Sequence, residues 1–175
     1  MSRVAWIACA KAVGVIALDQ LSKWWVLGPL DLPSRGQVPV APPLLNFTLV
    51  HNTGVSFHLF AGGDLSRWGL TAFSLGVAAV LGWWARTAER LLQAAGLGLI
   101  MGGAVGNALD RIRLGYVTDF VDVSAALPFF PWVFNVADSA ITIGVGVLLL
   151  DSLLAPKKPE PPATVRAADP GARPG

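Results

Sequence analysis

The chain has 175 residues, of which 54% are hydrophobic and only 14% charged, and its mean hydropathy is +0.58. A soluble domain usually carries about 25% charged residues, so this composition argues against a soluble enzyme and predicts an integral membrane protein. The net charge of +2 is too small for a nucleic-acid-binding surface, and the single cysteine excludes an intramolecular disulfide framework.

Four apolar stretches are long enough to cross a membrane as helices, which requires roughly 20 residues each. They cover about residues 4–27, 68–84, 91–109 and 133–154. The third stretch is rich in glycine and alanine, and small residues allow membrane helices to approach closely. We therefore predict an all-α membrane protein with four transmembrane helices within residues 1–154, and we interpret these glycines as packing residues.

The segment between the first two stretches, about residues 38–66, is predicted to form a small β element and loop on the outer membrane surface. Leu45, Phe47 and Leu49 alternate with their neighbours, as in a strand, and residues 52–54 read Asn-Thr-Gly, which is typical of a turn. Prolines at positions 39, 42 and 43 predict that the strand begins after them. Residues 155–175 contain six prolines and are predicted to be a disordered tail.

The distribution of basic residues predicts the orientation in the membrane. One side would carry eight of them: Arg3, Lys11, Arg86, Arg90, Lys157, Lys158, Arg166 and Arg173. The other side would carry four: Arg35, Arg67, Arg111 and Arg113. Because basic residues concentrate in cytoplasmic loops, both termini and the tail are predicted to be cytoplasmic.

Polar residues within the apolar stretches are costly and are therefore candidates for function. Asp19 and Lys23 are four residues apart, so they share a helix face and can form an ion pair. Asn107, Asp110 and Arg111 end the third stretch, where Asp110 and Arg111 are expected to neutralise each other.

Two carboxylates, Asp119 and Asp138, have no basic neighbour close in sequence, and both are predicted at the outer boundary of the bilayer. Burial and a second carboxyl group both raise a carboxyl pKa, so two such groups together would share one proton near neutral pH. Such a pair can activate a water molecule for peptide hydrolysis. Asn135 lies three residues before Asp138 and could hold a carboxylate or a substrate carbonyl. On these grounds alone, Asp110 or Asp122 could replace either member.

His51 and His58 are seven residues apart in the outer segment, and no third ligand stands near them in the sequence. A metal site usually needs at least three protein ligands. We interpret both as interfacial or core histidines and predict no metal site.

Five motifs in this order resemble those of bacterial lipoprotein signal peptidases (type II signal peptidases). They are residues 19–23 (DQLSK), 52–57 (NTGVSF), 102–111 (GGAVGNALDR), 115–120 (GYVTDF) and 134–141 (FNVADSAI). The resemblance covers about residues 4–154, all of the chain except the tail. Where the family often has an aromatic residue before the Asn-x-Gly segment, this chain has His51.

The resemblance implies an inner-membrane aspartic endopeptidase whose catalytic residues are Asp119 and Asp138. It removes the signal peptide of a prolipoprotein on the N-terminal side of a diacylglyceryl-modified cysteine. Other motif positions, implied to bind substrate or support the site, are Asp19, Lys23, Asn52, Gly54, Asn107, Asp110, Arg111, Asn135 and Ala137. The resemblance further implies inhibition by globomycin, contact with membrane lipid and no cofactor, metal or nucleic-acid partner. The active site would lie near the periplasmic face, and we expect a monomer.

Two alternative functions belong to other classes. Asp110, Asp119 and Asp122 loosely resemble the acidic cluster of a metal-dependent lipid-headgroup transferase, whose activity would vanish with a chelator. A small transporter could instead use Asp119 and Asp138 as proton carriers, but no inverted repeat supports this reading.

Overall fold

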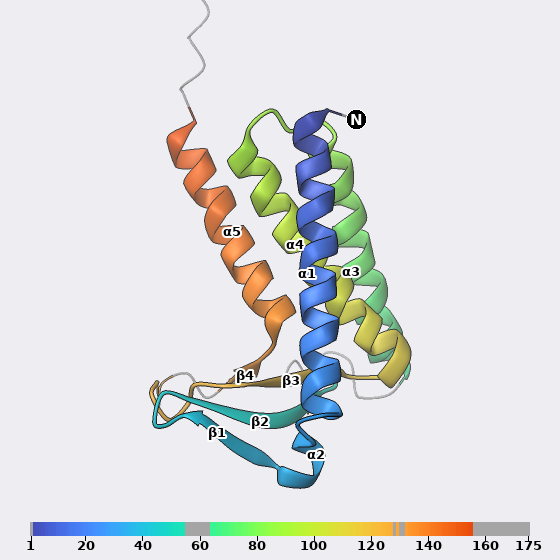
Figure 1. The fold of residues 1–175 in the computed structure, drawn as a ribbon. Coiled ribbons are helices and arrows are strands. Elements are labelled where there is room, and N and C mark those ends of the chain that lie inside the picture. The colour runs from blue at the N-terminus through green and yellow to red at the C-terminus, as the bar shows by residue number, and fades with distance from the viewer. Residues whose placement is uncertain (1, 55–63, 128, 130–131, 156–175) are drawn as a thin grey trace, which may run out of the picture.

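The computed structural model describes residues 2–54, 64–127, 129 and 132–155, and nothing is stated about the others. Four long helices form a bundle: α1 (Arg3–Leu27), α3 (Asp64–Ala85), α4 (Leu91–Leu114) and α5 (Val136–Leu154). All four are long and apolar enough to cross a membrane. The start of α1 and the end of α5 lie at the same end of the bundle (Figure 1). The predicted four-helix membrane fold is confirmed.

Helix α4 packs against the other three long helices, and its glycines allow this contact. A Cβ atom at Gly98 would lie 2.8 Å from the Cβ of Lys11 on α1. A Cβ at Gly96 would lie 2.9 Å from the carbonyl oxygen of Gly144 on α5. Real Cβ atoms do not approach neighbours this closely, so the backbones of α1 and α5 occupy the space that a larger side chain would need. The packing interpretation of these glycines is therefore supported.

A four-stranded antiparallel sheet lies at the end of the bundle opposite the start of α1 and the end of α5 (Figure 1). Its order is β1 (Gln37–Ala41), β2 (Leu45–Asn52), β3 (Val117–Asp122) and β4 (Val133–Phe134), and the short helix α2 (Leu32–Arg35) connects α1 to it. The Phe47 ring packs edge-on against Trp25 of α1 and Phe120 of β3, with ring centroids 6.2 and 5.5 Å apart. These aromatic contacts fix the sheet against the end of α1.

The structure differs from the sequence-based expectation at three places. Strand β1 contains Pro39, although the prolines were expected to delay the strand; β1 lies at the sheet edge, where a missing N–H group is tolerated. The fourth helix begins at Val136 rather than near 133, because Val133 and Phe134 pair with β3. The third helix continues to Leu114, where Gly115 ends it in the left-handed region at φ +87°.

Candidate active site

Asp119 lies in the middle of β3, between β2 and the start of α5. Its side chain is almost fully buried, with 2% exposed. The Nδ2 group of Asn135 donates a hydrogen bond to Asp119 Oδ1 at 2.7 Å, and Asn52 Nδ2 of β2 donates to Asp119 Oδ2 at 3.0 Å. Each carboxylate oxygen therefore has one neutral amide donor, which fixes the plane of the group without adding a charge beside it.

Asp138 lies in the first turn of α5, and a capping box positions it. Asn135, the N-cap residue, accepts a hydrogen bond from the Asp138 amide at 2.9 Å, while Asp138 Oδ2 accepts from the Asn135 amide at 3.3 Å. Asn107 Nδ2 of α4 donates to Asp138 Oδ1 at 2.8 Å. The capping box and this amide donor fix the position of the Asp138 carboxyl at the start of α5.

Asn135 connects the two carboxylates. It is fully buried, and its side chain caps α5 through the oxygen while its nitrogen holds Asp119. The same nitrogen lies 3.1 Å from Asn107 Oδ1, so the donors of both aspartates belong to one network. The expectation that Asn135 could hold a carboxylate agrees with this geometry.

A cavity of about 620 Å³ brings Asp119 and Asp138 to a common space. Its remaining lining is Asn52, Ser139, Thr142 and the apolar residues Val123, Leu127, Trp132, Val133, Phe134 and Ile143. Two acids beside an apolar wall form a site that can take a partly apolar chain and present one of its polar groups to the carboxyls.

The pKa of Asp119 is raised from its ordinary value of 3.8 to about 6, chiefly because burial penalises the charged form. The negative charge of Asp138 raises this pKa further, while the hydrogen bonds from Asn52 and Asn135 and the charge of Lys23 lower it. The pair therefore holds a proton at a higher pH than two isolated aspartates would, which is the property needed for general acid and base catalysis near neutrality.

A buried ion network lies behind the two aspartates. Lys23 Nζ is 2.8 Å from Asp19 Oδ2 and 2.9 Å from Asp110 Oδ2, and all three side chains are at most 4% exposed. Asp19 Oδ1 accepts a hydrogen bond from the amide of Ala137, the residue before Asp138, at 3.0 Å. Asp110 Oδ2 accepts one from the amide of Thr118, the residue before Asp119, also at 3.0 Å. One ammonium group thus ties α1 and α4 to the backbone beside both cavity aspartates.

The ion pair of Asp19 and Lys23 agrees with the sequence-based expectation. The ion-pair partner of Asp110 is Lys23 rather than Arg111, whose charge interacts more strongly with Asp138 and Asp119 than with Asp110. Asp110 faces Lys23 on α1, while the Arg111 guanidinium is 3.5 Å from the Asn107 carbonyl. Adjacent residues on a helix point about 100° apart, which directs the two side chains to different neighbours.

Gly54 and His51 occupy the end of β2 and the turn after it. The Gly54 amide donates to Asn52 Oδ1 at 2.9 Å, and its φ of +77° favours glycine, so the predicted turn orients Asn52 toward Asp119. His51 stacks against Tyr116, with ring centroids 4.1 Å apart, as an interfacial histidine would. His58 and residues 55–57 of the motif lie outside the described residues.

The acidic residues once considered as alternative dyad members occupy separate environments. Asp122 Oδ1 accepts hydrogen bonds from Ser124, and Thr48 donates to its other oxygen. Asp110 is held by Lys23, as described. Within the described part of the chain, no three histidine, cysteine or acidic side chains come together as metal ligands would. This arrangement gives no support to the metal-dependent transferase reading.

Gln20 is a member of the network that was not predicted from the sequence. Its Nε2 group donates to Asp110 Oδ1 at 3.0 Å, and its oxygen accepts from Arg113 at 3.1 Å. The sequence does contain a signal for Gln20, because its side-chain amide lies inside an apolar stretch between Asp19 and Lys23. Arg67 was also missed: it donates to the carbonyls of Arg111 and Ile112, both at 2.7 Å, and so caps the end of α4.

Comparison with known proteins decides the family. Residues 11–154 match the signal peptidase (SPase) II family. The chain belongs to the signal peptidase II family. The lipoprotein signal peptidase of Caulobacter vibrioides is 49% identical over 155 residues, covering 88% of this chain and 90% of that protein. The one from Methylorubrum extorquens is 47% identical over 149 residues, covering 84% and 86%.

A solved structure supports the same assignment at the level of the fold. A bacterial membrane enzyme determined by the in meso method at 1.9 Å resolution matches with a TM-score of 0.73 and 26% identity. The match covers 85% of this chain and 94% of that one. The present signal peptidase II is therefore a multi-pass membrane protease of this family, as the motifs predicted.

Proposed function

We propose that this signal peptidase II is an aspartic endopeptidase that cleaves prolipoproteins on the N-terminal side of the diacylglyceryl-modified cysteine. Asp119 and Asp138 are the catalytic residues and activate one water molecule between them. The observation that carries the proposal is that two carboxylates from separate elements line one cavity, and that the pKa of one is raised to about 6.

The proposed reaction needs one proton on the pair and one water molecule. Asp119, whose pKa is raised to about 6, carries the proton, and Asp138 acts as the base. Asp138 removes a proton from water as the hydroxyl attacks the scissile carbonyl carbon, while Asp119 donates its proton toward the carbonyl oxygen. The resulting gem-diol collapses, the C–N bond breaks, and the amine leaves with a proton from Asp138. Asp119 regains its proton from the second hydroxyl, so the pair returns to its starting state.

The apolar wall of the cavity supports the choice of substrate. Trp132, Leu127 and Ile143 line the same space as the two acids. A substrate that carries acyl chains and a signal helix in the membrane would place one peptide bond beside the carboxyls, and this binding energy would orient the bond for attack.

The proposed orientation places both termini and the tail in the cytoplasm and the sheet and cavity at the periplasmic face of the inner membrane. The basic residues of the sequence support it, since Arg3, Arg86 and Arg90 lie at the end of the bundle where α1 begins, and Lys11 lies in the half of α1 nearer that end. The predicted disorder of the tail concerns residues 156–175, which lie outside the described residues. Inhibition by globomycin and action as a monomer without cofactor remain part of this proposal.

A gel-shift assay with a lipid-modified precursor tests the dyad. The wild-type protein should cleave the precursor, globomycin should block cleavage, and Asp119→Asn and Asp138→Asn should each be inactive while remaining folded. Asp122→Asn, a substitution on the same strand outside the cavity, serves as the control and should cleave. Wild-type turnover in either dyad variant would remove that residue from the mechanism, and loss of cleavage on adding a chelator would favour the metal-dependent alternative.

A further inference from the structure

A second groove lies on α1, in the half of the bundle remote from the sheet. Its volume is about 410 Å³, within the range of roughly 300–1,000 Å³ typical of ligand sites. Its lining is almost entirely apolar: Ile7, Ala10, Gly14, Val15 and Leu18 of α1 and Leu99 of α4, with Lys11 as the one charged residue. A Cβ atom at Gly14 would meet nothing within 4 Å, so the groove is open along this side of α1.

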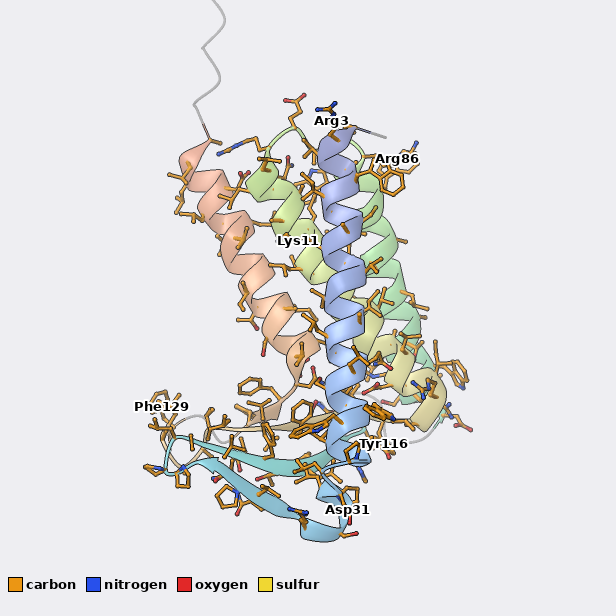
Figure 2. The ribbon with its side chains drawn as sticks, in the orientation of Figure 1. Arg3, Lys11, Asp31, Arg86, Tyr116 and Phe129 are labelled. Carbon is orange, nitrogen blue, oxygen red and sulfur yellow. The ribbon has the colours of Figure 1, made fainter. Side chains whose placement is uncertain are left out.

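Lys11 is an unusual residue for this position. It lies eight residues after Arg3, about 12 Å along the helix axis, and thus within the apolar part of α1. Figure 2 shows Arg3 and Arg86 at the end of the bundle, with Lys11 nearer its middle. Among the residues that the structure describes, Lys11 forms no ion pair and no hydrogen bond. A cation inside a membrane helix is costly, and its cost is offset when its flexible stem reaches a charged headgroup.

We propose that this groove binds an anionic phospholipid of the cytoplasmic leaflet, with an acyl chain along Gly14 and Leu18 and the phosphate at the Lys11 ammonium. Two molecules could occupy this groove, a membrane phospholipid or the signal peptide of a substrate, and the charge of the groove favours the phospholipid. No acidic residue lines the groove. A signal peptide has a basic segment at its cytoplasmic end, which Lys11 would repel, whereas basic pockets between membrane helices attract anionic headgroups. The leaflet assignment rests on the orientation given under the proposed function.

Native mass spectrometry of the delipidated full-length protein tests the site. Phosphatidylglycerol and phosphatidylcholine with the same acyl chains are added in turn, and the bound fractions are compared for wild type, Lys11→Gln and Gly14→Leu. Arg86→Gln is the matched control. Arg86 is also basic and lies at the end of the bundle where α1 begins, but it is outside the groove and stacks on Trp83. Cleavage of the lipid-modified precursor is measured on the same four proteins.

Wild type should retain phosphatidylglycerol preferentially. Lys11→Gln should lower its retention about fivefold, which corresponds to about 1 kcal/mol for one basic residue near a headgroup, and should leave phosphatidylcholine unchanged. Gly14→Leu keeps the charge but fills the groove, so it should lower the retention of both lipids, while Arg86→Gln should resemble wild type.

Equal retention of both lipids by wild type, or an unchanged preference in Lys11→Gln, would overturn the proposal, as would displacement of the lipid by a basic signal peptide. Lipid retention in micelles does not depend on cleavage or on orientation. Failure of the lipid site and failure of the proposed catalytic function are therefore observed separately.

Discussion

Replacing Asp119 by asparagine should abolish cleavage and also make the protein more stable at neutral pH. Burial and the charge of Asp138 raise the pKa of Asp119 from 3.8 to about 6. A carboxyl group with a raised pKa binds its proton more tightly in the folded state, so the free energy of unfolding falls as pH rises from 3.8 through 6 and then levels off. At 1.36 kcal/mol per pKa unit, the ionised Asp119 costs about 3 kcal/mol above pH 7.

Asp119→Asn also removes one hydrogen bond, and its loss must be subtracted from the gain in the free energy of unfolding. Asn52 Nδ2 donates to Asp119 Oδ2, and an amide nitrogen in that place cannot accept, at a cost of about 1 kcal/mol. The variant should therefore be about 2 kcal/mol more stable than wild type above pH 7 and about 0.5 kcal/mol less stable near pH 4. For a chain of this length, the gain above pH 7 raises Tm by about 4–8 °C.

Thermal unfolding of wild type and variant in identical micelles, from pH 4 to pH 8, measures this difference, and other titrating groups cancel in the comparison. Asp122→Asn on the same strand is the control with the opposite sign. Hydrogen bonds from Ser124 lower the pKa of Asp122, so its carboxylate stabilises the fold at neutral pH and this contribution is lost as pH falls. A Tm difference for Asp119→Asn that does not change with pH would show that the pKa of Asp119 is not raised.

Three further substitutions test the architecture. Lys23→Met leaves two buried carboxylates without their shared cation and should destabilise the protein by about 3–5 kcal/mol, seen as a lower Tm and yield; a wild-type Tm would contradict the network. Gly98→Val should cost about 1–3 kcal/mol by separating α1 from α4, whereas Gly76→Ala on α3, where nothing lies within 4 Å, should not lower Tm. Asn135→Ser retains a capping oxygen but removes the donor to Asp119. The kcat of this variant should therefore fall at least about tenfold, measured at a temperature where the variant is folded. An unchanged kcat would exclude Asn135 as a positioning residue.

The helices could be predicted because the membrane makes their signals strong, whereas Asp119 and Asp138 stood out because neither has a basic neighbour close in sequence. In lipid, the backbone must satisfy its own hydrogen bonds, so long apolar stretches are helices, and a polar residue there stands out. Strand β2 was also readable, since one face of it is more apolar than the other. The same reasoning identified Asn135 as a partner of a carboxylate, because its distance from Asp138 is local in sequence.

Strand β3 was harder to recognise from sequence. Five of its six residues are buried, on both faces of the sheet, so the usual alternation of apolar and polar side chains is absent. The ion pair of Lys23 with Asp110 was missed for another reason. It joins two helices 87 positions apart, and only the rotation of α1 against α4 determines which side chains meet. Sequence spacing shows the neighbours along one helix and not those across two.

Charged and neutral groups have different places in this site. One cation, Lys23, fixes the backbone beside Asp119 and Asp138 from behind through its two buried carboxylates. The charges of Lys23 and Arg111 also act on Asp119 from outside hydrogen-bond distance. Inside the cavity, the groups that donate to the two acids are neutral amides of asparagine. An ammonium or guanidinium in their place would lower the pKa of Asp119 and remove the proton that the proposed reaction requires. Neutral donors orient both carboxyls without placing a further cation at hydrogen-bond distance, so the pair can still keep one proton near neutral pH.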